Sequence, residues 1–214
     1  MKKLCSLIAI VSLSLVSAYA DEQETVDRCI RIIRDARQMP ETNIPRSVLK
    51  QSRGVAIMTV VKAGFIFSGK GGHGVVVART NRGWSGPSFV GTGGAGWGLQ
   101  AGVQATDFIF VLNNNAAVRA FSKGGNVTLG ADASVAAGPV GRDAHVGVAP
   151  TAAIYAYSRT KGLFAGASLE GAVLVTRKGA NQSYYGRPVN ARDILSGRVP
   201  PPPGAARLRA ALSR

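Results

Sequence analysis

The chain begins with a segment whose apolar residues follow the period of an α-helix. Over residues 22–39 they recur every three or four positions, which places them on one face. Acidic residues fall in the first turn, where they suit the helix dipole, and Pro40 ends the pattern. A second short helix is expected over residues 44–53. The apolar face of the first helix comprises Val26, Cys29, Ile30, Ile33 and Ala36.

From residue 54 the pattern changes to short β-rich runs separated by glycine. Near the middle, residues 129–142 are almost wholly small, which suits a place where backbones approach closely. Strands in one run, with amphipathic N-terminal helices and short C-terminal ones, favour an α+β fold. We expect a single glycine-rich domain with a curved or barrel-like, mostly antiparallel sheet. Strands are expected at 54–61, 64–67, 74–80, 87–92, 99–104, 107–113, 127–140, 154–157 and 163–177, and further helices at 115–122, 180–185 and 191–195.

Residues 1–20 have the pattern of a secretory signal peptide. Two lysines precede an apolar stretch, and Ala-Tyr-Ala at 18–20 supplies the small residues of a cleavage site. The stretch is too short for a membrane span. We therefore expect an exported protein, periplasmic or secreted and peripherally associated with a membrane. The folded domain is expected over residues 21–197, followed by a mobile, proline-rich basic tail over 198–214.

The chain carries a strong excess of positive charge. Without its first 20 residues it has 24 basic and 11 acidic residues, a net charge of +13. This charge favours anionic partners, namely lipid headgroups, nucleic acid or polyanionic glycans. Export and the lack of interleaved aromatic and basic residues argue against nucleic acid. One cysteine, Cys29, remains after cleavage, so we expect no intramolecular disulfide and a buried thiol.

Basic residues on the two N-terminal helices are the candidates for contact with an anionic partner. Three lie on the polar side of the first helix, and three form an i, i+4, i+7 stripe on the second. Two interpretations are open for the first helix. It packs on the domain with its arginines in solvent, or its basic face lies on an anionic membrane surface, and the two can coexist. The six residues are Arg28, Arg31, Arg34, Arg46, Lys50 and Arg53.

Motifs for nucleotide binding are incomplete. Residues 64–70 have the spacing of a phosphate-binding loop, but Gly71 stands where Ser or Thr is needed, and no strand–loop–helix context surrounds it. Two G-x-G-x-x-G matches begin at Gly69 and Gly91, and the first leads into a strand, which has no helix N-terminus to hold a pyrophosphate.

Signals for catalysis and metal binding are equally weak. A catalytic triad of Ser168, His145 and Asp132 can be imagined, and a hydrolase that uses Ser134 is another alternative. Nothing in the spacing of these residues places a general base beside the nucleophile or a group that would orient the base. Scattered acids and a single cysteine give no metal-ligand cluster. We expect no enzyme activity, no cofactor and no metal.

Several segments together resemble the SYLF-domain (Ysc84-like) family, in the order in which the family carries them. The resemblance covers roughly residues 25–197, and the chain is identified as an exported bacterial member of this family. The segments are KAGFIFSGKGGHGVVVAR (62–79), WSGPSFV (84–90), GLQAGVQATDFIFV (98–111), LGADASVAAGPVGR (129–142), YSRTKGLFAGASLEGA (157–172) and ANQSYYG (180–186).

The resemblance implies a lipid-binding module. Eukaryotic relatives bind phosphoinositides through a basic amphipathic N-terminal region, and some bind and bundle actin. Lys62 and Lys70 lie inside one matched segment and join the candidate lipid-binding residues. For an exported protein we expect docking on an anionic phospholipid membrane, since each basic residue near such a surface contributes about 1 kcal/mol. The alternative is an actin-binding or structural protein-interaction module.

Overall fold

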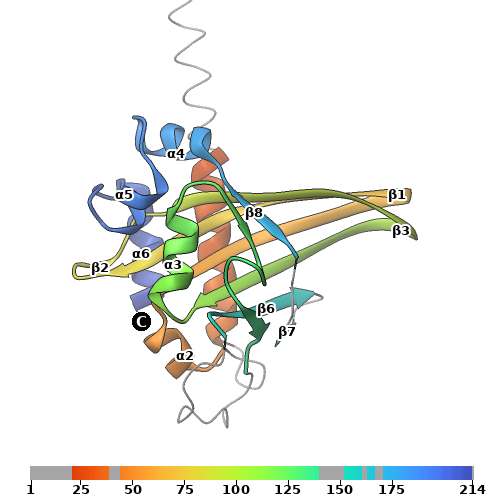
Figure 1. Ribbon diagram of the computed structural model, residues 1–214, viewed down its shortest axis with the longest axis horizontal. Helices are drawn as coiled ribbons and strands as arrows, with labels where there is room; N and C mark the ends of the chain where they lie inside the picture. Colours follow the sequence, from red (N-terminus) through yellow and green to blue (C-terminus); the bar gives the residue numbers. More distant parts are fainter. Residues whose placement is uncertain (1–20, 39–43, 140–151, 161–162, 167–170, 214) are drawn as a thin grey trace, which may run out of the picture.

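The computed structural model describes residues 21–38, 44–139, 152–160, 163–166 and 171–213. Helices cover one end of a curled, half-barrel sheet whose described strands pair antiparallel, except β5 beside β6 and one isolated bridge (Figure 1). The predicted α+β class with a strongly curved sheet is confirmed. The elements are the N-terminal helix (residues 21–38), α2 (Arg46–Gln51), β1 (Gly54–Thr80), β2 (Gly83–Trp84), β3 (Ser88–Leu112), α3 (Asn115–Ser122), β4 (Asn126–Thr128), β5 (Val135–Ala137), β6 (Ile154–Thr160), β7 (Leu163–Gly166), β8 (Val173–Thr176), α4 (Lys178–Tyr185), α5 (Ala191–Leu195), η1 (Pro203–Ala205) and α6 (Ala206–Ser213).

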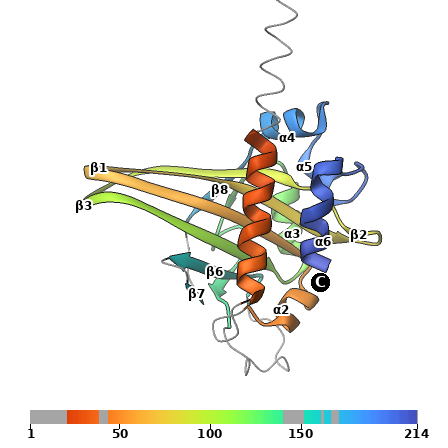
Figure 2. The same ribbon diagram turned by 180° about the vertical axis from the view of Figure 1, so that it is seen from behind.

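β1 and β3 form one long ribbon that organises the molecule. They pair from Gly54↔Leu112 to Val76↔Ser88, with a single register shift between Gly64 and Ile66. Both strands turn back in their middle, so the ribbon projects away from the helices (Figures 1 and 2). At its base the two ends of β1 meet again. Here the structure differs from the six short strands predicted, because glycine lets a strand bend without leaving its hydrogen-bonded ladder.

The sheet is buried on both faces near the base of the ribbon. Alternate residues of β1 point to opposite sides, so Val55 and Ile57 enter one core while Ala56 and Met58 enter the other. The N-terminal helix and α6 cover the first side, and α3 and α5 cover the second (Figure 2). This double burial explains why the strand segments read as nearly continuous apolar runs.

The N-terminal helix confirms the helical prediction over residues 22–38, and residue 39 lies outside the described residues. Its apolar face is fully packed against the sheet, with Val26 and Ile33 completely buried. Cys29 is buried as predicted, and its thiol donates to the carbonyl of Ile57 (3.4 Å). Burial raises the pKa of this thiol to about 12, so it is a packing group.

Two segments that were each predicted as one long strand are divided into shorter strands. The segment 127–140 is interrupted after β4 by a turn in which Gly130 has a positive φ of 95° and the Asp132 carboxylate accepts from the Thr128 amide (2.7 Å). The segment 163–177 becomes β7 and β8. The helices α3 and α5 have the predicted bounds, and α4 begins two residues earlier than predicted.

The segment predicted as a mobile basic tail is packed on the domain. Leu208 and Leu212 of α6 are buried, and the guanidinium of Arg209 donates to the carbonyl of Trp84 (2.6 Å). Arg37 of the N-terminal helix donates to the carbonyl of Leu212 (3.1 Å). Apolar residues at helical spacing in α6 hold this segment on the domain. The proline lies at the start of η1, the short helix that precedes α6.

One arginine ties the N-terminal helix to the sheet. Arg159 of β6 donates to Asp35 of the helix (2.6 Å) and to Asp107 of β3 (2.7 Å). Thr59 of β1 donates to the second oxygen of Asp107 (2.7 Å). Burial is the largest single cause acting on the pKa of Arg159 and lowers it, but the hydrogen bonds that the guanidinium donates to both carboxylates raise this pKa overall. The network spans three strands and one helix.

Candidate functional site

Five basic side chains gather around α2, and we call this surface the α2 basic face. Arg46 and Lys50 are exposed one turn apart on α2, and Arg53 follows its C-terminal cap. These three residues are the predicted stripe, although the helix is shorter than the predicted 44–53. Among the described residues none of the five forms an ion pair. The face consists of Arg37, Arg46, Lys50, Arg53 and Arg79.

Arg79 is the fixed member of the α2 basic face. Its guanidinium donates to the carbonyls of Ser52 (3.0 Å) and Leu49 (3.2 Å) and stacks over the ring of Trp84, 4.5 Å from the ring centroid. Partial burial, and then the charge of Arg53, lowers its pKa. These contacts hold a positive charge in place beside further positive charges, at a cost in self-repulsion that a bound anion offsets.

Arg37 joins this face from the N-terminal helix. Burial lowers its pKa first, and the charges of Arg46 and Arg79 lower it further. No local sequence pattern marked its role, because Arg37 and Arg79 are far apart in the chain and only the tertiary fold makes them neighbours. In the sequence alone, neither residue can be distinguished from an arginine on a solvated surface.

The three arginines predicted on the N-terminal helix lie elsewhere on the surface. Arg31 and Arg34 are exposed, and Arg28 pairs with Glu24 one turn earlier (3.0 Å). The apolar face of this helix is buried in the domain, so only its mixed-charge side is available. Contact between this helix and a membrane, with the domain intact, would therefore be electrostatic and without insertion of the apolar face.

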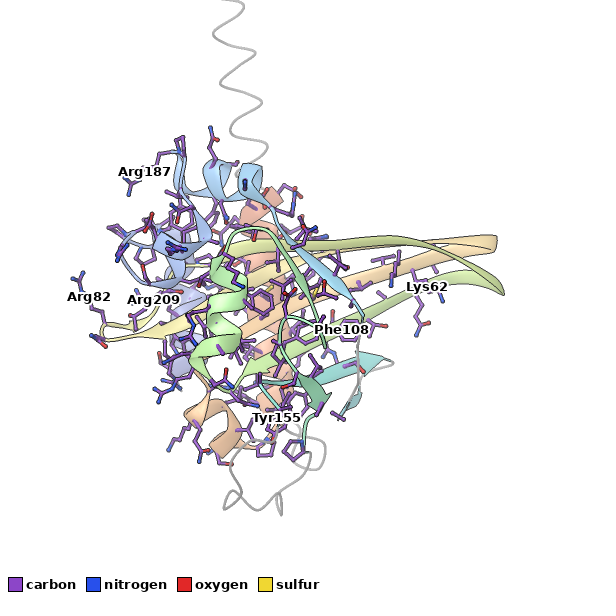
Figure 3. All side chains as sticks on the ribbon, in the orientation of Figure 1. Lys62, Arg82, Phe108, Tyr155, Arg187 and Arg209 are labelled. Carbon is purple, nitrogen blue, oxygen red and sulfur yellow. The ribbon has the colours of Figure 1, made fainter. Side chains whose placement is uncertain are left out.

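Lys62 and Lys70 lie at a third place, the mouth of a groove on the sheet. The groove has a volume of about 280 Å³ and runs along the side of the ribbon that faces β8. Met58, Val60 and Lys62 alternate along β1 on its lining, which period-2 geometry requires. Figure 3 shows Lys62 out along the ribbon and Phe108 nearer to the helices.

The groove changes character along its length, and we call it the ribbon groove. Its inner end is formed by buried Met58, Phe110 and Leu174, whereas Lys62 and Lys70 at the outer end are exposed. Phe108 and Phe110 stack with ring centroids 5.9 Å apart and an angle of 8° between the rings. An apolar floor with a cationic mouth is complementary to an anionic amphiphile. The lining residues are Met58, Val60, Lys62, Lys70, Thr92, Gln104, Thr106, Phe108, Phe110, Ala172 and Leu174.

Of the three residues in the imagined triad, the structure describes only Asp132. Ser168 and His145 lie outside the described residues. Asp132 caps a turn, as described above, and Ser134 accepts a hydrogen bond from the Ala153 amide (2.9 Å). Residues 64–70 belong to β1, which confirms the strand predicted at 64–67 but not the turn expected after it. Among the described residues, no group of His, Cys, Asp and Glu could hold a metal ion.

Residues 93–214 match the protein-family model Ysc84, described as "Las17-binding protein actin regulator". The chain belongs to the Ysc84 family. The resemblance identified from the sequence motifs is therefore confirmed. The family description is that of a regulator that binds other proteins, and it names no enzyme activity.

Two similar proteins of greater length are eukaryotic. This Ysc84-family chain is 50% identical over 165 residues to LAS seventeen-binding protein 3 of Saccharomyces cerevisiae, a match that covers 75% of this chain and 36% of the relative. It is 44% identical over 170 residues to human SH3 domain-containing YSC84-like protein 1, covering 78% of this chain and 50% of the relative. The chain thus spans half or less of these relatives. Export, the signal peptide and a bacterial origin remain predictions.

Proposed function

We propose that this Ysc84-family chain is a protein-binding module that acts on actin or an actin regulator through the α2 basic face. The observation that carries the proposal is the clustering of five cations around α2, none of them paired with a described carboxylate. Two members are held in place by hydrogen bonds to backbone carbonyls. A preorganised positive surface fits an acidic protein surface, because it pays little ordering entropy on binding.

The comparisons support a protein as the partner. The family description speaks of Las17 binding and actin regulation, and the yeast relative is named for binding LAS seventeen. Among the described residues, no helix combines the length and the apolar character that spanning a bilayer requires.

Reversing the charge of α2 is expected to weaken binding to filamentous actin. In the Arg46→Glu/Lys50→Glu variant we expect the Kd in a co-sedimentation assay to rise at least tenfold, equivalent to about 1.4 kcal/mol. Both side chains are exposed, so circular dichroism should show an unchanged fold.

The matched control is Arg31→Glu/Arg34→Glu, which makes the same change in net charge on the N-terminal helix. It should lower binding only slightly, and raising the salt concentration should weaken wild-type binding. Equal losses in the two variants would remove the α2 basic face from the proposal. No co-pelleting by the wild-type protein would remove actin itself.

A second candidate function is docking on anionic lipid, which the ribbon groove favours. The two lysines at its mouth suit an anionic headgroup, and Phe108 and Phe110 on its floor suit part of an apolar chain. Its volume, about 280 Å³, is just below the usual range of ligand-pocket sizes, which run from roughly 300 to 1,000 Å³.

Vesicle binding separates this candidate from the first. The Lys62→Ala/Lys70→Ala variant should bind phosphatidylglycerol-containing vesicles about thirtyfold more weakly than the wild type, since each lysine contributes about 1 kcal/mol. The Arg31→Ala/Arg34→Ala variant removes the same charge away from the groove and tests the predicted N-terminal helix surface. Wild-type binding that is equal for neutral and anionic vesicles, or insensitive to salt, would contradict lipid docking.

A further inference from the structure

A cleft at the C-terminal end of the fold has a chemistry that neither candidate function uses. It lies between the end of α3, the end of β8, and the helices α4 and α5, and its volume is about 710 Å³. We call it the C-terminal cleft. Arg187, one of its lining residues, projects from the loop beyond α4 in Figure 3.

Four basic residues line the C-terminal cleft, and each comes from a different local structure. Lys123 caps the end of α3, Lys178 begins α4, Arg187 follows the end of α4, and Arg192 lies in α5. All four are exposed, and none forms an ion pair among the described residues. Three helices and the loop that follows α4 therefore place positive charge around one cleft.

The single acidic residue among the lining groups does not neutralise this charge. The carboxylate of Asp193 accepts from the side-chain amide of Asn190 (2.7 Å) and pairs with Arg198 (3.4 Å). Its backbone carbonyl accepts from the amides of Arg198 and Val199. The Asp193 carboxylate is thus already bonded within the wall of the cleft, and the lining residues together carry a net positive charge.

Local structure makes this wall preformed. Gly186 ends α4 in the left-handed conformation, with φ 66°, and turns the chain towards Arg187. Asn190 then caps α5, and its side chain accepts from the Asp193 amide (2.8 Å). A ligand would therefore meet charges that are already positioned by their backbone.

The same wall also carries apolar surface. Pro188, Val189 and Val199 line the cleft between the basic residues, and Val199 is 8% exposed. A bare phosphate compound would satisfy the cations but leave these side chains without a partner. A peptide that alternates carboxylates with apolar side chains satisfies both, and the volume suits a short segment of such a peptide.

We propose that the C-terminal cleft binds an acidic peptide segment of a protein partner, with carboxylates on the basic residues and an apolar side chain against the valines. The inference rests on the proposed function for the existence of a protein partner, and it adds a second contact surface. Carboxylate recognition by arginine is bidentate, which favours Arg187 and Arg192 as the determinants of affinity.

Fluorescence anisotropy with a labelled peptide of alternating Asp or Glu and Leu tests the cleft directly. We expect saturable binding to the full chain that is at least tenfold weaker in the Arg187→Glu/Arg192→Glu variant. Binding should be lost when Asn and Gln replace the acids of the peptide. The Arg31→Glu/Arg34→Glu variant carries the same net charge and should bind as the wild type does.

Three outcomes would overturn the inference. These are no saturable binding, equal loss in the two charge variants, or cleft-dependent binding of pyrophosphate without binding of the peptide. Actin co-sedimentation of the wild type, run in parallel, separates the two proposals. Failure of the peptide to bind while actin still co-pellets would refute the cleft alone.

Discussion

Replacing Gly74 with alanine is expected to destabilise the protein by about 3 kcal/mol or more, or to prevent folding. A Cβ at this position would overlap the carbonyl oxygen of Ile57 and the Cα and Cβ atoms of Met58. Both neighbours are buried in β1, one in each core, so neither can move aside without disturbing packing. Urea denaturation followed by circular dichroism measures the change.

Gly71→Ala is the matched control for this substitution. Gly71 lies in the same strand, and an added Cβ would meet no other atom within 4 Å. We expect the free energy of unfolding to stay the same or to rise by up to about 1 kcal/mol, because alanine restricts the unfolded chain. Similar losses at Gly74 and Gly71 would show that the close approach of the two halves of β1 does not matter for stability.

Replacing Arg159 with methionine is expected to lower the free energy of unfolding by about 2–3 kcal/mol. The change leaves Asp35 and Asp107 without their shared cation, and the Asp107 and Arg159 side chains are only 19% and 17% exposed. The expected loss is below that of a fully buried pair, because the Asp35 side chain is 42% exposed and water screens its charge.

Arg28→Met provides the comparison for Arg159. The Arg28–Glu24 pair is a surface i, i+4 interaction, with side chains 34% and 64% exposed. Its removal should cost less than about 1 kcal/mol. If both variants unfold at the same urea concentration, the link between the N-terminal helix and the sheet contributes no more than an ordinary surface pair.

Local sequence signals were sufficient for α3 and α5 but not for the ribbon. The bounds of α3 and α5 follow from asparagine caps whose side chains accept from backbone amides, and such caps depend only on neighbours in sequence. In β1 and β3, glycine was interpreted as a turn because it often is one. The bend at the far end of the ribbon uses the same freedom while the strand continues, and only pairing with the other strand distinguishes the two cases.

For the same reason, the candidate site could be predicted only in part from the sequence. The stripe of Arg46, Lys50 and Arg53 depends on helical spacing and was found from the sequence. The contribution of Arg37 and Arg79 depends on tertiary packing and was not. Lys62 and Lys70 came from a matched motif, but the apolar groove beside them is completed only when β8 pairs with β3 and adds Leu174 to the lining.

Contacts between the first and last elements have a consequence for synthesis of the protein. The side-chain amide of Gln23 donates to the carbonyl of Gly204 (3.5 Å), a separation of 181 residues, and Tyr184 donates to Gln23 (3.1 Å). During synthesis, the apolar face of the N-terminal helix stays partly exposed until these later segments have left the ribosome. Nascent chains should therefore attract chaperones throughout elongation, and native structure should form only once the last helix has emerged.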